Sequence, residues 1–157
     1  DSRLRGFKQA LRNYPNIQIV SSQTANWERD QGYNVFQNIL ESHPEVQALF
    51  ACNDMMALGA IEAIAASGKT GRITVMGFDA LPEAREAVRK GTMEATIAQS
   101  PMEMGALAVE SASRLLKGES VTQDVSIKIR LITRENVDSG QGSTPESGKT
   151  PVSDSQK

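Results

Sequence analysis

An aromatic ring, two amides and a carboxylate each stand where an apolar, strand-like run of this sequence ends, at Trp27, Asn53, Gln99 and Asp79. In a parallel α/β sheet the carboxyl ends of the strands share one edge, and open α/β folds bind their ligands at that edge. We therefore expect the four side chains to converge on one crevice. Their chemistry is stacking and hydrogen bonding, which suits a small polar ligand, and no catalytic group accompanies them.

The elements that must position these side chains alternate between strands and helices. Short apolar or β-branched runs bounded by turn residues predict strands, at Ile17–Val20, Val46–Ala51, Ile73–Phe78 and Glu94–Ala98. Apolar residues at helical spacing predict helices over Ser2–Asn13, Trp27–Ser42, Asp54–Ser67 and Pro82–Lys90. A strand followed by a helix, repeated along the chain, predicts an α/β fold with a parallel sheet and right-handed crossovers.

Local signals mark the ends of the predicted helices. Asn53 or Asp54 can cap the free N–H groups of the helix that follows, and Gly68 can supply the left-handed residue that ends it. Pro82 suits a first helical turn because its missing N–H is not needed there, and Gly91 is a C-terminal stop signal.

Length and charge limit what the chain can be. Its 157 residues, 39% of them hydrophobic, suffice for one domain with a core but not for two of ordinary size. A net charge of -2 and a pI near 5.5 predict no binding to nucleic acid or to an anionic membrane surface. The one cysteine, Cys52, cannot form an internal disulfide, and we expect a small inert side chain at the end of a buried strand.

Features that suggest catalysis lack the residues that catalysis would require. Ser-Gly-Lys-Thr occurs at 67–70 and at 147–150, but Ala63 and Ser143 replace the first glycine that a phosphate-binding loop requires. His43 has no orienting partner, serine elbow or metal-binding pattern with it, so we predict a surface residue. Asp79 lacks the acidic pair that would hold Mg²⁺ in a phospho-accepting domain. The sequence therefore predicts neither an enzyme nor a cofactor or metal site.

Several motifs in fixed order resemble the carboxy-terminal half of bacterial periplasmic sugar-binding proteins of the ribose-binding type. They are Trp27–Asn38, Phe50–Ala60, Val75–Asp79 and Ala95–Pro101, and the resemblance runs from about Asp1 to Asn136. It implies one flavodoxin-like lobe, with a parallel sheet and helices on both faces, of a two-lobed solute receptor of an ABC importer. Such a receptor is periplasmic or extracytoplasmic and closes on a monosaccharide before meeting the importer's membrane subunits.

The resemblance also implies roles for the residues already singled out. Trp27 would stack on the apolar face of the sugar ring, and Asn53, Asp79 and Gln99 would bond its hydroxyls. Each has a structural alternative: Trp27 can cover the core, Asn53 can cap a helix, Asp79 can hold a turn and Gln99 can be an exposed strand end. Their joint placement favours ligand contact at all four, whereas Asp54 is better explained as a cap.

One position departs from the expected pattern. The resemblance implies an arginine that contacts the ligand, and counted back from Gly6-Phe7 its position falls on Asp1. Asp1 can still accept hydrogen bonds from hydroxyls, or Arg3 can reach inward. This departure, together with a tryptophan in the stacking position, leaves the identity of the sugar open.

The resemblance divides the chain into four parts. Residues 1–99 would form the sugar-binding lobe without its first strand, and 100–124 a hinge crossing and a helix belonging to a second lobe. Residues 125–137 would close the domain with a final strand, and 138–157, which are almost free of apolar side chains, would be a disordered tail. Because the chain opens on a helix with no strand before it, we expect a truncated protein, weak sugar binding and an apolar surface on the 102–118 helix.

A competing function is the sugar-sensing domain of a lactose-repressor-type transcription regulator, which has the same two-lobed form. The importer receptor is favoured by three stretches that look like such receptors, at Ala98–Gly105, Leu115–Glu119 and Thr133–Asp138.

Overall fold

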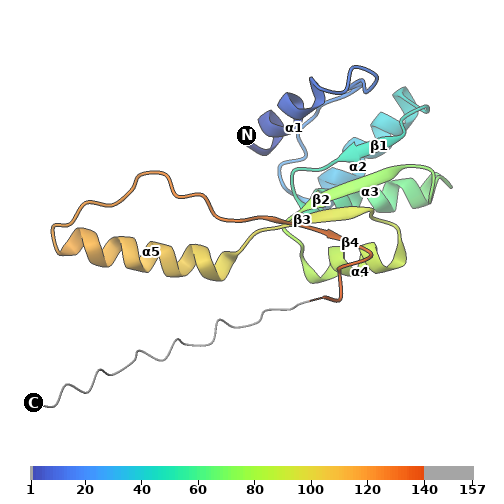
Figure 1. The fold of residues 1–157 in the computed structure, drawn as a ribbon. Coiled ribbons are helices and arrows are strands. Elements are labelled where there is room, and N and C mark those ends of the chain that lie inside the picture. Colours follow the sequence, from blue (N-terminus) through green and yellow to red (C-terminus); the bar gives the residue numbers. More distant parts are fainter. Residues whose placement is uncertain (1, 140–157) are drawn as a thin grey trace, which may run out of the picture.

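The computed structural model describes residues 2–139. Five helices and four strands follow one another in the described part (Figure 1). In chain order they are α1 (Ser2–Leu11), α2 (Arg29–Ser42), β1 (Ala48–Phe50), α3 (Asp54–Ala66), β2 (Thr74–Phe78), α4 (Pro82–Lys90), β3 (Ala95–Ala98), α5 (Pro101–Leu116) and β4 (Arg130–Thr133). The alternation confirms the predicted α/β fold.

The four strands form one sheet in the order β1-β2-β3-β4. The first three are parallel, as predicted, and Phe50, Met76 and Ala95 lie in register across them. The last strand, β4, runs antiparallel to β3, so the final strand returns along the sheet instead of extending the parallel series. Parallel pairing in this register puts the carboxyl ends of β1, β2 and β3 on one edge.

The predicted strand at Ile17–Val20 is wrong. The segment has no strand structure, and the side chains of Ile17, Ile19 and Val20 are exposed. Its β-branched composition suits a strand, but a strand also needs a neighbour with which to exchange hydrogen bonds. In the described part of the chain β1 pairs only with β2, and nothing extends the sheet toward this segment.

Helices α2, α3 and α4 form a layer that covers one face of the sheet. They contact one another and the strands, and they bury an apolar core that includes Phe36, Leu58, Val75, Val88 and Met93. At the α2–α3 crossing, a Cβ on Gly59 would collide with the backbone of Arg29 and Tyr33. The crossing is thus closer than any larger residue at position 59 would permit.

Helix α1 lies against the opposite face. Side chains alternate between the two faces of a strand, so Leu49, which packs on the core, and Phe50 point in opposite directions. The ring of Phe7 stacks on that of Phe50 with 4.7 Å between centroids. This contact fixes which side of α1 faces the sheet.

The signals for the helix ends act as predicted in three places. The side chain of Asn53 caps α3, accepting from the Met56 amide at 2.9 Å. Gly68, after α3, and Gly91, at the end of α4, adopt φ angles of 67° and 75°, in the left-handed region open to glycine.

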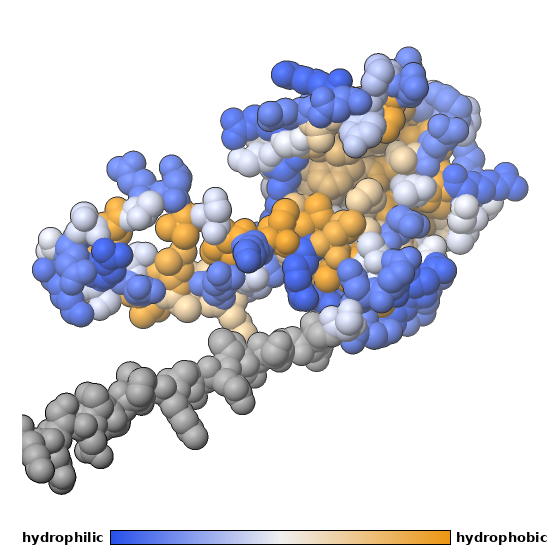
Figure 2. All heavy atoms as spheres, viewed as in Figure 1, coloured by the Kyte–Doolittle hydropathy of each residue, from blue (hydrophilic) through white to orange (hydrophobic). Residues whose placement is uncertain are grey.

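Helix α5 projects away from the sheet, and the chain returns beside it to reach β4 (Figure 1). None of its residues is buried, and Met102, Val109 and Leu116 are strongly exposed. Figure 2 shows apolar side chains along this projection and at its junction with the sheet. The apolar surface expected on this helix is therefore confirmed. No helix among the described residues has both the length and the apolar character to cross a bilayer.

The beginning of the predicted tail contacts the folded part. The Asp138 carboxylate accepts a hydrogen bond from Arg89 of α4 at 2.7 Å. The rest of the predicted tail, from residue 140, lies outside the described residues, as does Asp1.

Candidate functional site

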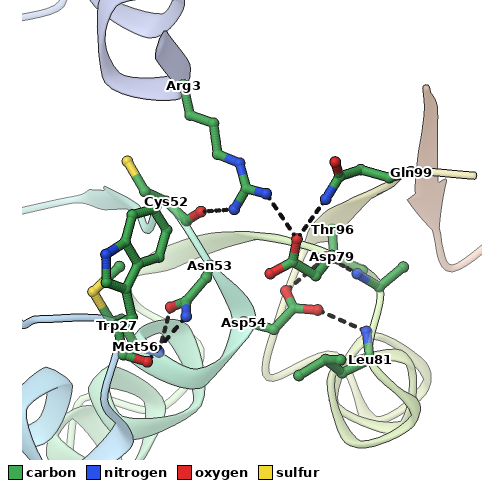
Figure 3. A network of polar contacts seen from close by, with 11 residues as sticks. Arg3, Trp27, Cys52, Asn53, Asp54, Met56, Asp79, Leu81, Thr96 and Gln99 are labelled. Atoms are coloured by element: carbon green, nitrogen blue, oxygen red, sulfur yellow. Dashed lines mark hydrogen bonds and ion pairs between the residues drawn. The ribbon is translucent and has the colours of Figure 1, made fainter. Parts of the chain in front are cut away.

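Three of the predicted site residues come shortly after the ends of the three parallel strands. Asn53 comes after β1, Asp79 after β2 and Gln99 after β3, and all three side chains lie at one edge of the sheet (Figure 3). Trp27 reaches the same edge differently, from the loop before α2, because the run that precedes it is not a strand. The predicted convergence of these four residues is what the structure has.

The carboxylate of Asp79 is the centre of the arrangement. Its Oδ1 accepts a hydrogen bond from Gln99 Nε2 at 2.8 Å and from Arg3 Nη2 at 3.0 Å. The side chains of Arg3 and Asp79 are about one-quarter exposed, so the ion pair borders on solvent. A carboxylate offers more lone pairs than these two donors use, so Asp79 can accept further hydrogen bonds.

The side chain of Arg3 reaches the site edge, which is one of the two alternatives considered because the arginine position implied by the resemblance falls on Asp1. Besides Asp79, its guanidinium donates to the Cys52 carbonyl at 2.6 Å. It lies over the Phe78 ring, 3.9 Å from the centroid, and 5.6 Å from the centroid of the Trp27 ring. Arginine commonly combines such stacking with planar hydrogen bonding.

The sequence left Asp1 and Arg3 open as alternatives, and helical spacing is the signal that favours Arg3. Arg3 precedes Phe7 by four residues, so both lie on one face of α1. Since Phe7 stacks on β1, Arg3 must also face the sheet.

Asn53 combines a structural and a potential binding role. Its Oδ1 caps α3, its Nδ2 donates to the Trp27 carbonyl at 3.0 Å, and the residue is only 7% exposed. An amide group has four hydrogen-bonding positions, and these two contacts occupy two of them. Asn53 therefore does cap the helix, as the structural alternative proposed, and its side chain also holds the backbone of Trp27.

Trp27 presents its ring at the edge without being part of the core. The residue is 50% exposed, and its φ of 68° follows a φ of 48° at Asn26. Left-handed backbone is unusual for such a bulky residue. Because Asn53 bonds the Trp27 carbonyl, the cap of α3 also stabilises this conformation.

Asp54 is not a helix cap, contrary to the sequence interpretation. Asn53 makes the cap, and the fully buried Asp54 carboxylate instead accepts from the Leu81 amide at 2.8 Å and the Thr96 hydroxyl at 2.7 Å. Burial raises the pKa of Asp54, and the hydrogen bonds from Thr96 and Leu81 oppose that rise. Short-range capping logic missed these two contacts because both partners are distant in sequence.

Cys52 follows β1 and is partly exposed. Desolvation raises the pKa of its thiol, with Arg3 acting in the opposite direction. A thiol with a raised pKa is a poor nucleophile at neutral pH, which agrees with the inert role expected for it. Within residues 2–139, no group of three or more His, Cys, Asp and Glu side chains is arranged to hold a metal ion.

The family of the chain follows from comparison with known proteins. Residues 1–120 match the model of the periplasmic binding protein domain. The chain belongs to this family. It is 43% identical over 133 residues to the ribose import binding protein of Escherichia coli, covering 85% of this chain and 44% of that protein. It is 39% identical over 110 residues to the D-allose-binding periplasmic protein of the same organism, covering 70% and 35% respectively.

Solved structures of the family have the same fold. An ABC transporter solute-binding protein of Actinobacillus succinogenes with bound D-allose matches with a TM-score of 0.79 and 37% identity, over 84% of this chain and 47% of that one. A glucose-galactose binding protein of Geobacillus stearothermophilus matches with a TM-score of 0.83 and 29% identity, over 86% and 48%. The chain thus spans less than half the length of the relatives that it matches.

Proposed function

We propose that this chain supplies one side of the monosaccharide site in a solute receptor of an ABC importer. The observation that carries the proposal is the Asp79 carboxylate, held by Arg3 and Gln99 beside the exposed ring of Trp27. Sugar hydroxyls both donate and accept hydrogen bonds, whereas the axial C–H groups of the ring suit an aromatic face. The edge offers both kinds of partner.

Each group has a role in this proposal. Trp27 stacks on the ring, Asp79 accepts from a hydroxyl, and Gln99 and Arg3 can both donate to hydroxyl oxygens. The Asn53 amide adds one further contact on the Trp27 side. Asp1 stays a predicted contact. The sugar is a pentose or hexose, consistent with relatives named for ribose and D-allose.

The remainder of the proposal concerns the rest of the receptor. Residues 1–99 form the sugar-binding lobe, Gln99–Pro101 the hinge crossing, and α5 a helix that packs on a second lobe. The exposed apolar side chains of α5 support this division, because an amphipathic helix is normally stabilised by burying its apolar face. The proposed receptor is extracytoplasmic and delivers its sugar to the importer's membrane subunits.

Nuclear magnetic resonance of this chain tests the sugar site. Ribose, D-allose and myo-inositol, titrated at millimolar concentrations, probe sugars related to those named for relatives and neighbours. With only one side of the cleft present we expect a Kd weaker than about 1 mM for the best sugar. The Trp27 indole N–H and the side-chain amide of Gln99 should shift with that sugar.

Two variants make the titration specific. Trp27→Ala should abolish the shifts at Gln99, whereas Tyr14→Ala, which removes another exposed aromatic ring, should leave them unchanged. A folded chain in which no sugar moves these signals would contradict the proposed site. Micromolar binding measured by calorimetry would instead contradict the division of the contacts between two lobes.

The coding sequence upstream of residue 1 distinguishes receptor from regulator. A signal peptide or lipoprotein leader followed by a βαβ pattern supports the importer receptor. A helix-turn-helix there would identify a lactose-repressor-type regulator and overturn the proposed location and partners.

A further inference from the structure

The turn after β2 carries the central carboxylate of the site in an unusual backbone conformation. Asp79 has a φ of 114° and Ala80 a φ of 54°, two successive non-glycine residues with positive φ. Such conformations are energetically unfavourable and persist only where the surroundings impose them. Something must therefore hold this turn.

A buried carboxylate and a buried hydroxyl accept hydrogen bonds from the backbone of this turn. The Leu81 amide donates to Asp54 Oδ2 at 2.8 Å, and the Ala80 amide donates to Thr96 Oγ1 at 3.1 Å. Thr96 in turn donates to Asp54 Oδ1 at 2.7 Å. Asp54 and Thr96 are both fully buried and come from α3 and β3, so two elements distant in sequence bond the turn (Figure 3).

The direction of these hydrogen bonds is determined by chemistry. An ionised carboxylate only accepts, so the single hydroxyl hydrogen of Thr96 goes to Asp54. The oxygen of Thr96 is then free to accept from the Ala80 amide. A side chain without a hydroxyl at position 96 would leave the Ala80 N–H without this partner and would remove one donor from the buried Asp54 carboxylate, and both losses are unfavourable in a protein interior.

The absence of a side chain at Gly77 leaves space for the Asp54 carboxylate. A Cβ on Gly77 would collide with Oδ1 of Asp54, and the φ of Gly77 is not in the left-handed region. A glycine at position 77 of β2 is thus explained by the space that the Asp54 carboxylate needs, and not by backbone freedom. Strand β2 and the turn after it therefore both pack against the Asp54 carboxylate of helix α3.

We propose that Asp54 and Thr96 are positioning residues, which set the Asp79–Leu81 turn and so place the Asp79 carboxylate for the sugar. The inference rests on the proposed function, since it assigns Asp54 and Thr96 a part in that same site. Neither side chain faces the edge where Trp27 and Gln99 lie, so they act through the turn alone.

The Thr96→Val and Thr96→Ser variants test the proposal without removing the buried carboxylate. Valine keeps the shape of threonine and loses the hydroxyl, whereas serine keeps the hydroxyl. Thr74→Val, at an exposed position on β2, is the matched control. Asp54→Asn is a second probe, because Thr96 and Leu81 donate to different carboxylate oxygens and asparagine replaces one of these oxygens by an NH2 group, which cannot accept.

The first readout needs no sugar. The Gln99 side-chain amide donates to Asp79, whereas the hydrogen bonds of Asp54 and Thr96 go to the turn and to each other, so the Gln99 chemical shift reports where the Asp79 carboxylate lies. Thr96→Val should move this signal and speed exchange of the Ala80 amide, Thr96→Ser should restore both, and Thr74→Val should move neither. Loss of stability alone, with an unchanged Gln99 signal in the folded chain, would overturn the positioning role.

The second readout is affinity for the best sugar of the panel. Thr96→Val should weaken binding by about tenfold, the effect of roughly one charge-assisted hydrogen bond. In the Asp79→Asn background the same change should have less effect, because the group that it positions has been altered. Equal effects in both backgrounds would overturn the inference. If no sugar binds at all, the proposed function fails, and the Gln99 signal still decides whether Asp54 and Thr96 position Asp79.

Discussion

Helices α3 and α5 have similar lengths, 13 and 16 residues, but opposite surroundings. Seven residues of α3 are buried between α2, α4 and the sheet, whereas no residue of α5 is buried. Both sequences specify a helix, and both carry apolar side chains. From this difference we expect the stability of a helix in this protein to depend on the partner that covers its apolar face more than on its own propensity.

Amide hydrogen exchange should show this contrast most strongly. Amides in the middle of α3 open only when the lobe unfolds, whereas α5 can open alone. We expect exchange in α3 to be slower than in α5 by at least about a thousandfold, since domain stabilities begin near 5 kcal/mol. Comparable protection of the two helices would mean that α5 is covered in solution.

Truncation of one leucine in each helix should separate them by free energy of unfolding. Leu58 of α3 is 5% exposed and Leu116 of α5 is 90% exposed. Leu58→Ala should lower the free energy of unfolding by about 2–5 kcal/mol through lost burial and a new cavity. Leu116→Ala should change it by less than about 0.5 kcal/mol. Urea unfolding followed by circular dichroism measures both, and similar losses would contradict the comparison.

Replacing one glycine in each helix by alanine should change stability in opposite directions. Gly59→Ala places a Cβ against the backbone of α2, and overpacking of this kind destabilises by about 1–3 kcal/mol. A Cβ on Gly105 would meet no other described residue within 4 Å, so Gly105→Ala should stabilise α5 by about 0.5–1 kcal/mol through helix propensity. The first effect is measured by urea unfolding and the second by the helical signal in circular dichroism. Destabilisation by Gly105→Ala would indicate a hidden contact.

The smallest effect is a pH dependence confined to the packed lobe. Burial raises the pKa of Asp54 above its ordinary 3.8, so the folded state binds this proton more tightly than the unfolded state does. Its contribution to stability is fully present below pH 3.8 and is lost as the pH rises through the raised pKa. Asp54→Asn cannot titrate, so the difference in Tm between wild type and variant should favour wild type more at acidic than at neutral pH. A difference that does not vary with pH would show that Asp54 titrates normally.

The sequence predicted those parts of the candidate site that depend only on the order and direction of the strands. Asn53, Asp79 and Gln99 come directly after buried apolar runs, and parallel strands necessarily bring their carboxyl ends to one edge. Trp27 was placed correctly at that edge, although the run before it is not a strand. Arg3 was one of two alternatives, and the stacking of Phe7 on Phe50 explains why it faces the sheet. Asp1 lies outside the described residues.

The wrong expectations share a physical cause, which is dependence on a distant partner. Ile17–Val20 has the composition of a strand but no neighbour in the described sheet. Asp54 stands where a cap is expected, yet its partners are Leu81 and Thr96, which lie 27 and 42 residues away. Local pattern cannot identify such partners, because it does not say which surfaces meet.

The sequence alone determined the alternation of helices with the three parallel strands, most of the helix ends and the placement of four candidate site residues at one edge of the sheet. These depend on apolar periodicity, on the conformational preferences of glycine and proline and on the geometry of parallel strands, all of which act locally or by general rule. Tertiary structure alone decided which apolar faces are covered and which buried carboxylate holds the Asp79 turn. Those outcomes depend on contacts between elements far apart in the chain, whose free energy no single segment contains.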